Sequence, residues 1–178
     1  DYVLNGVKQF ITTGKHADVA VVFAVTDRGA GKKGISGFIV DTASPGYVVA
    51  RVEDKLGQRA SDTAQIVFED CRVPAANRLG AEGEGFKIAM RVLDRGRLHI
   101  SAVCVGVAER LIADCVAYAS ERIQFGKPIA DHQLIQAMIA DSKTEALAAR
   151  ALMLETAARK DKGDNVVMES AAAKYYAS

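Results

Sequence analysis

The sequence predicts a multidomain α+β protein, with an antiparallel β-barrel or sandwich followed by an up-and-down helical bundle. Residues 1–75 hold short β-branched runs separated by turn residues, a spacing that is typical of antiparallel sheet. From Phe86 onward apolar residues recur at i, i+3 and i+4, which is the period of a helix. We therefore expect a β domain over residues 1–78 and the first part of a helical bundle over residues 79–178.

The β region contains five runs that suit strands, at residues 7–12, 18–26, 34–41, 47–52 and 64–68. No helical pattern separates them, so we do not expect a doubly wound parallel sheet. Three glycines, Gly80, Gly83 and Gly85, superficially resemble a phosphate-binding loop. They do not follow a strand that feeds a βαβ unit, so a flexible turn into a helix is the favoured interpretation.

The helical region contains two long periodic segments. The first runs from Gly85 to about Glu121 and the second follows residue 133. Gly163 then ends a helix and Asn165 caps the next one. We expect partner helices to cover the apolar stripe of the first segment, which comprises Ile100, Val103, Cys104, Val107, Ala108, Leu111, Ile112, Cys115, Tyr118 and Ala119.

Composition excludes several classes of protein. The 23 basic residues nearly balance the 22 acidic ones, which gives no reason to expect binding to nucleic acid or to a membrane surface. No apolar run is long enough to span a bilayer. The three cysteines and three histidines are scattered, with neither disulfide nor metal-site spacing. Reduced thiols indicate a cytoplasmic protein or one of the mitochondrial matrix.

Two short clusters offer chemistry. Phe10 and Thr12 are two apart on a strand, so they share a face that suits a planar, hydrogen-bonding ring; the alternative is a strand end with a core Phe. Asp94 and Arg97 share a helix face with Gly96 between them. A mid-helix glycine suits close approach of a ligand, and the alternative is a solvated ion pair.

The third cluster is the break between the two helical segments, from Arg122 to Gln133. It is longer and chemically richer than a helix connection requires. Arg122 can form a fork to a phosphate. We place Asp131 at the N-cap of the next helix, whose start at His132 would offer free N–H groups to an anion. A capped surface turn is the alternative.

Together these residues are more specific than any one of them, and the chain resembles the acyl-CoA dehydrogenase family over essentially all of its length. The segments that carry the resemblance are NGVKQFIT (5–12), GISGFIVD (34–41), KLGQRASDTAQIVFEDCRVP (55–74), GEGFKIAMRVLDRGRLHISAVCVGVAE (83–109) and ERIQFGKPIADHQLIQ (121–136). The resemblance implies an FAD-dependent oxidoreductase of fatty acid metabolism that converts an acyl-CoA thioester to the 2,3-enoyl-CoA. It implies a homotetramer, a dimer of dimers, that passes electrons to an electron-transfer flavoprotein.

The resemblance also assigns residues. Phe10 and Thr12 match positions beside the flavin, and Arg122 matches an Arg that reaches the cofactor of a neighbouring subunit. The FAD-contacting segment continues through Gln124, Phe125, Ile129, His132 and Gln133. Asp94, Arg95, Gly96 and Arg97 match a segment near the acyl and pantetheine part of the substrate.

No residue of this chain matches the catalytic base. Some branches of the family carry a Glu immediately before the Arg that matches Arg97, and here that position is Gly96. We therefore expect the chain to be incomplete and the base to lie beyond Ser178. The open alternatives are a relative that uses oxygen, such as an acyl-CoA oxidase or nitroalkane oxidase, and a non-catalytic paralogue acting in assembly.

Overall fold

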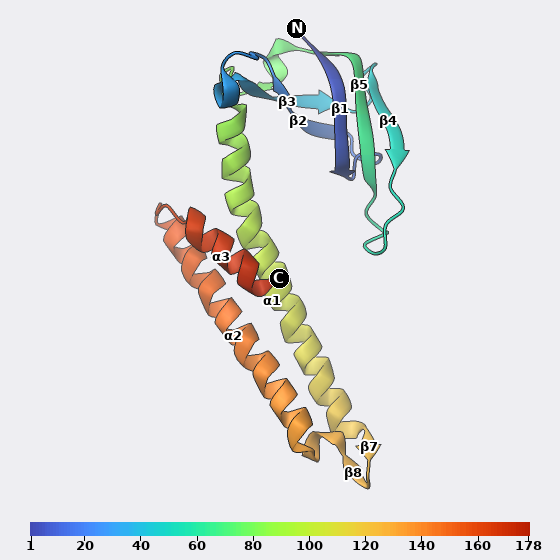
Figure 1. Cartoon of the computed structure of the whole chain (residues 1–178), viewed down its shortest axis with the longest axis vertical. Helices are drawn as coiled ribbons and strands as arrows, with labels where there is room; N and C mark the ends of the chain where they lie inside the picture. The colour runs from blue at the N-terminus through green and yellow to red at the C-terminus, as the bar shows by residue number, and fades with distance from the viewer. The chain divides into compact units, whose positions relative to one another are not determined.

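A computed structural model describes residues 1–178, and the chain divides into two compact units, Asp1–Met90 and Arg91–Ser178. The first unit holds strands β1 (Tyr2–Thr12), β2 (Val19–Val25), β3 (Ile35–Asp41), β4 (Tyr47–Val52), β5 (Thr63–Val73) and β6 (Arg78–Leu79), and the 3₁₀ turns η1 (Gly31–Gly34) and η2 (Ala75–Asn77). Helix α1 (Gly85–Glu121) begins in this unit and continues into the second. The predicted change from strands to long helices is confirmed (Figure 1).

The β unit consists of two antiparallel three-stranded sheets, in the orders β1-β5-β4 and β2-β3-β6, and it forms no closed barrel. Side chains from both sheets share one core, as in a sandwich. Its buried members are Leu4, Val22, Phe38, Val40, Ala64, Ile66, Phe68, Cys71 and Val73. The Nζ of Lys8 also crosses between the sheets and donates to the carbonyl oxygen of Phe23 at 2.7 Å.

The glycines before α1 are explained by close packing. A Cβ on Gly83 would lie 2.2 Å from the carbonyl oxygen of Lys33, and one on Gly85 would lie 2.6 Å from the carbonyl carbon of Ser36. Because these contacts are with backbone atoms, neither neighbour can move aside easily. The segment is therefore a tight turn that fits only glycine at these two positions.

The helical unit contains most of α1, the hairpin strands β7 (Ile123–Gln124) and β8 (Lys127–Pro128), the 3₁₀ turn η3 (Ile129–Asp131), and helices α2 (Gln133–Asp161) and α3 (Val167–Ala177). Successive long helices reverse direction, first at the hairpin and then at Gly163 (Figure 1). This up-and-down order is the one predicted. None of the helices has the length and apolar character needed to cross a membrane.

Two predicted helix caps were wrong. A 3₁₀ turn intervenes before α2, so its N-cap is His132 rather than Asp131, and no side chain caps it. The N-cap of α3 is Val166, although the Oδ1 of Asn165 accepts a hydrogen bond from the N–H of Val167 at 3.4 Å. Both errors are of one residue, because a short turn shifted the point at which helical geometry begins.

The predicted apolar stripe of α1 is only partly covered within the chain. The buried residues of this helix include Leu98, Ser101, Val105 and Ala119. The other side remains exposed although it is also apolar, and it carries Ile100, Val103, Val107, Leu111 and Tyr118. Apolar residues therefore surround much of α1, a pattern that is typical of a helix enclosed on all sides.

Candidate functional site

Phe10 lies at a β-bulge near the end of β1, where the pairing with β5 shifts between Lys8 and Ile11. Its φ angle is +57°, in the left-handed region that bulky residues rarely adopt. The Phe10 side chain is 69% exposed and Thr12 is exposed as well. The alternative of a core Phe is therefore excluded, because the strand holds this ring out in solvent at a cost in backbone strain.

The segment after α1 forms a hairpin with an exposed aromatic residue at its tip. Ile123 pairs with Pro128 and Gln124 with Lys127, which leaves a two-residue loop. Its residues, Phe125 and Gly126, have φ angles of +52° and +79°, so this is a type I′ turn. Asn or Asp usually takes the first of these positions, yet here a phenylalanine adopts it.

Phe125 is the more exposed of the two strained aromatic residues, with 92% of its surface accessible. Its ring lies 6.1 Å from that of His132 in an edge-to-face arrangement. The Nε2 of His132 also lies 3.4 Å from the carbonyl oxygen of Gln124. Phe125, Gln124 and His132 therefore lie together at one corner of the helical unit, and the aromatic ring at its tip is exposed.

The same corner carries unsatisfied positive charge. Arg122 is exposed, and no carboxylate lies within ion-pair distance of its guanidinium. Its backbone N–H continues the α1 ladder to Tyr118 at 2.9 Å, and its carbonyl accepts from Ile129 at 2.8 Å. The backbone is therefore fixed while the side chain is free. Nearby, the uncapped N-terminus of α2 at Gln133 leaves N–H groups available.

The Asp94–Arg97 cluster forms the ion pair that one interpretation predicted. The Nη1 of Arg97 lies 2.7 Å from the Oδ1 of Asp94, and both side chains are partly buried. The carbonyl of Arg97 also accepts from the buried hydroxyl of Ser101 at 2.9 Å. A Cβ added at Gly96 would meet no heavy atom within 4 Å, so open space lies beside the helix backbone there.

Two of these clusters lie far apart along α1, one within the helix and one directly after its C-terminal end. From Arg97 to Arg122 there are 25 steps along the chain, which correspond to about 38 Å at 1.5 Å per residue. That is longer than one dinucleotide cofactor. The hairpin and the Asp94–Arg97 cluster of the same chain are therefore too far apart to line one compact site.

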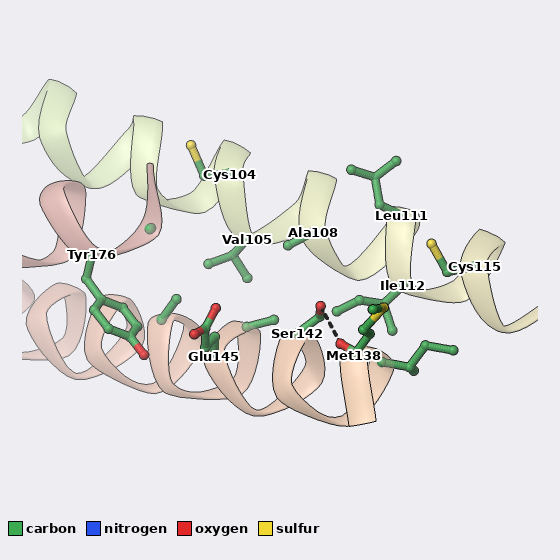
Figure 2. Close-up of a pocket in the computed structure, with 14 residues that line it drawn as sticks. Cys104, Val105, Ala108, Leu111, Ile112, Cys115, Met138, Ser142, Glu145 and Tyr176 are labelled. Atoms are coloured by element: carbon green, nitrogen blue, oxygen red, sulfur yellow. Dashed lines mark hydrogen bonds between the residues drawn. The ribbon is translucent and has the colours of Figure 1, made fainter. Parts of the chain in front are cut away.

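One cavity of the helical unit contains none of the predicted site residues. It measures about 590 Å³ and lies among α1, α2 and α3. Figure 2 shows Val105 and Ile112 of α1 pointing toward α2, where Ser142 donates to the carbonyl of Met138 at 2.8 Å. Most of its lining is aliphatic, so it has the composition of a bundle interior rather than of a site for a charged nucleotide.

One polar cluster lies just after the end of β1 and was not predicted from the sequence. The Nδ1 of His16 lies 2.8 Å from the Oδ1 of Asp62, and the N–H of Lys15 donates to the Oδ2 at 2.9 Å. These bonds hold the pKa of Asp62 below its usual value, the His16 bond contributing most. Burial, with a smaller effect of Asp62, raises the pKa of Tyr47. The contacts span 46 and 47 residues, so only the strand pairing could have indicated them.

Comparison with known proteins identifies the family. The family model for the acyl-CoA dehydrogenase middle domain matches residues 1–71, and that for the acyl-CoA dehydrogenase C-terminal domain matches residues 83–178. The β sandwich corresponds to the middle domain that the first model describes, and the long antiparallel helices correspond to the C-terminal domain that the second model describes. The chain belongs to the acyl-CoA dehydrogenase family, which confirms the resemblance inferred from its motifs.

Relatives span this chain almost completely. Acryloyl-CoA reductase (NADH) of Anaerotignum propionicum is 51% identical over 100% of this chain and 45% of that relative. The caffeyl-CoA reductase–Etf complex subunit CarC of Acetobacterium woodii is 45% identical over 99% of this chain and 47% of that relative. The solved structure of butyryl-CoA dehydrogenase from Megasphaera elsdenii superposes with a TM-score of 0.94 at 45% identity, over 99% of this chain and 46% of that chain. This chain therefore spans less than half the length of each.

Proposed function

We propose that this chain is the middle β domain (residues 1–78) and the first part of the C-terminal helical domain (residues 79–178) of an FAD-dependent acyl-CoA dehydrogenase. Its reaction would be the α,β-desaturation of an acyl-CoA thioester. The observation that carries the proposal is the pair of strained, exposed phenylalanines, Phe10 and Phe125. Neither ring contributes to the core, so both are better explained as ligand contacts.

The residues present fit FAD chemically. Phe10 offers an aromatic face and Thr12 a hydroxyl on the exposed side of β1, which suits an isoalloxazine ring. Arg122 and the free N–H groups at Gln133 suit a diphosphate, because both favour negative charge. We assign Gln124, Phe125, Ile129 and His132 to the same contact segment. When bound, the flavin would supply the acceptor for the hydride that leaves the β-carbon.

The substrate would lie beside the open face of α1. We assign substrate contacts to Asp94, Arg95, Gly96 and Arg97, because space lies next to the Gly96 backbone. Asp94 is a poor candidate for the catalytic base, because its Oδ1 accepts a 2.7 Å hydrogen bond from Arg97 and is therefore already occupied. We therefore assign the base to a carboxylate outside residues 1–178.

The site would be completed by a second subunit. Because the hairpin lies about 38 Å along α1 from the substrate segment, it would contact the cofactor of a neighbouring chain. The exposed apolar side of α1 supplies a surface for such association. A homotetramer built as a dimer of dimers satisfies both requirements. The electron acceptor would be an electron-transfer flavoprotein, in line with the Etf complex named for the relative from Acetobacterium woodii.

FAD retention tests the proposal directly. In the full-length protein, Arg122→Ala should weaken FAD binding about tenfold or more, because a charge-assisted fork to the diphosphate is lost. Arg28→Ala is the matched control, since Arg28 is also exposed but lies in the loop after β2. Equal flavin occupancy in the two variants would contradict the role given to Arg122.

A second candidate is the reverse reaction, reduction of a 2,3-enoyl-CoA. It is favoured by the reductase names of the relatives from Anaerotignum propionicum and Acetobacterium woodii. Steady-state rates with a saturated and an unsaturated thioester of equal length distinguish the two directions. Reaction of the reduced protein with oxygen separates a dehydrogenase from an oxidase, and failure to bind any flavin would favour a non-catalytic paralogue.

A further inference from the structure

We propose that four side chains, Arg51, Glu53, Gln9 and Gln65, form a hydrogen-bonded chain that keeps β1 in its bulged register and so holds Phe10 on the outer face. We call this set the register lock. The inference rests on the proposed function, in which Phe10 packs beside a flavin ring. It adds positioning residues that lie on β4, β1, β5 and the loop after β4.

The bulge decides which side chains face the core. Lys8 pairs with Ile66 and Ile11 pairs with Ala64, and both partners on β5 are fully buried. Lys8 and Ile11 therefore both point inward, although they are three residues apart. Regular alternation would allow this only for residues two or four apart. One extra residue in β1 makes the difference.

Without that extra residue, Phe10 would face the core. Side chains two apart share a face, so an unbroken strand that kept Lys8 inward would also turn Phe10 and Thr12 inward and Ile11 outward. A one-residue change of register exchanges the two faces of a strand. The bulged register is thus a precondition for presenting Phe10 and Thr12 to a ligand, and it is maintained despite the left-handed backbone at Phe10.

The register lock acts at the bulge itself. Gln9 shares with Phe10 the position opposite Gln65. The Nε2 of Gln65 donates to the Oε1 of Gln9 at 2.6 Å, and the Nε2 of Gln9 donates to the Oε1 of Glu53 at 2.7 Å. Both ends of the Gln9 amide are therefore held, one by each neighbouring segment.

Glu53 is in turn fixed by a guanidinium. The Nη2 of Arg51 lies 2.7 Å from each carboxylate oxygen of Glu53, and the Nε of Arg51 lies 3.2 Å from the Oε1. The Glu53 side chain is only 16% exposed. A charged, nearly covered acceptor of this kind is a stronger anchor for the Gln9 amide than water would be.

A charge swap tests the register lock in the full-length protein. Gln9→Glu places a carboxylate next to Glu53, and like charges at hydrogen-bond distance repel. The double variant Gln9→Glu/Glu53→Gln restores a donor facing an acceptor at both ends and restores the net charge. Glu69→Gln is the control, because Glu69 is an exposed carboxylate on β5 without a side-chain partner.

The readouts are those of the flavin environment. Gln9→Glu should weaken FAD binding about tenfold and shift the visible circular dichroism and the reduction potential of the bound flavin, and the double variant should recover all three. A merely structural role would alter the unfolding midpoint but leave these signals of the FAD-saturated protein unchanged. Unchanged signals in Gln9→Glu, or no recovery in the double variant, would overturn the inference.

A second measurement reports the register itself. The chain contains no tryptophan, so F10W introduces a single indole into it. The difference in fluorescence emission between F10W and the unmodified protein reports the exposure of position 10. Adding Gln9→Glu should shift this emission to the blue, and adding the double change should reverse the shift. If the unmodified protein bound no flavin, the proposed function would fail, while this emission would still support or refute the register lock.

Discussion

Gly96 provides a test in which stability and activity should move in opposite directions. Gly96→Ala places a methyl group where no heavy atom lies within 4 Å, so it causes no steric clash within this chain. Alanine exceeds glycine in helix propensity by about 1 kcal/mol. The free energy of unfolding should therefore rise by about that amount, measured by urea denaturation followed by circular dichroism.

Activity should fall in the same variant. If the thioester approaches the α1 backbone at Gly96, the added methyl group displaces it from its reactive position. A misplacement of about 1 Å can cost two orders of magnitude in rate, so kcat/KM for a short acyl-CoA should drop about tenfold or more. The measurement is steady-state turnover of the full-length protein.

Gly106 supplies the matched control, because it also lies within α1 and also has open space where a Cβ would be. Gly106→Ala should stabilise the helix by a similar amount and leave kcat/KM unchanged. Ten residues separate the two glycines, which is about 15 Å along the helix, so their effects on stability should add. Equal activity in the two variants would refute the placement of the substrate beside Gly96.

Three further expectations concern stability, pH and association. Ser170→Ala should raise the free energy of unfolding by about 1 kcal/mol, because the Ser170 hydroxyl is fully buried without a hydrogen-bond partner; thermal and urea unfolding measure this. The pKa of Asp62 is lowered in the folded state, mainly by the hydrogen bond to His16. The carboxylate therefore stabilises the fold at pH values above its unfolded pKa. This contribution is lost as the pH falls toward the folded pKa. Asp62→Asn should therefore show a shallower loss of stability below about pH 4, as followed by pH-dependent unfolding. Leu111→Glu should weaken subunit association, because it places a charge on the exposed apolar side of α1, and light scattering coupled to gel filtration reports the change in mass.

Each of these expectations has its own control. Ser101→Ala should not stabilise, since the Ser101 hydroxyl is also buried but donates to the Arg97 carbonyl. Asp18→Asn changes an exposed carboxylate before β2. This variant should lose folding stability at low pH in the same way as the unmodified protein. Arg110→Ala changes an exposed residue next to Leu111 and should leave the assembly intact. Loss of mass in Arg110→Ala, or none in Leu111→Glu, would count against the apolar side of α1 as the interface.

The sequence predicted the element types well because hydrophobic period is a local property. The strand at Tyr47–Val52 and the helix from Gly85 to Glu121 have the predicted bounds. The buried side of α1 was harder to predict, since apolar residues occupy both of its sides and the period alone cannot choose between them. Tertiary packing selects Leu98 and Val105 over Val103 and Val107.

The clusters of candidate site residues could be predicted from the sequence. The hydrogen bonds and backbone geometry that position them could not. Phe10 and Arg122 stand out because their residue types and neighbours form recognisable motifs. Gln9 and Glu53 lie 44 residues apart and meet only because β1 and β4 pair with the same strand, β5. The strain at Phe125 could not be predicted from the sequence either. Its positive φ angle results from the backbone of the turn and not from the residue type.

The turn at Phe125 and Gly126 bears on the association proposed above for two chains. The Phe125 ring is carried by a two-residue loop with fixed backbone angles and is backed by the His132 ring. A backbone segment that is already ordered loses little conformational entropy when it enters a binding site. In the proposed assembly, the entropic cost of ordering this turn would thus be met when each chain folds, before the two chains meet.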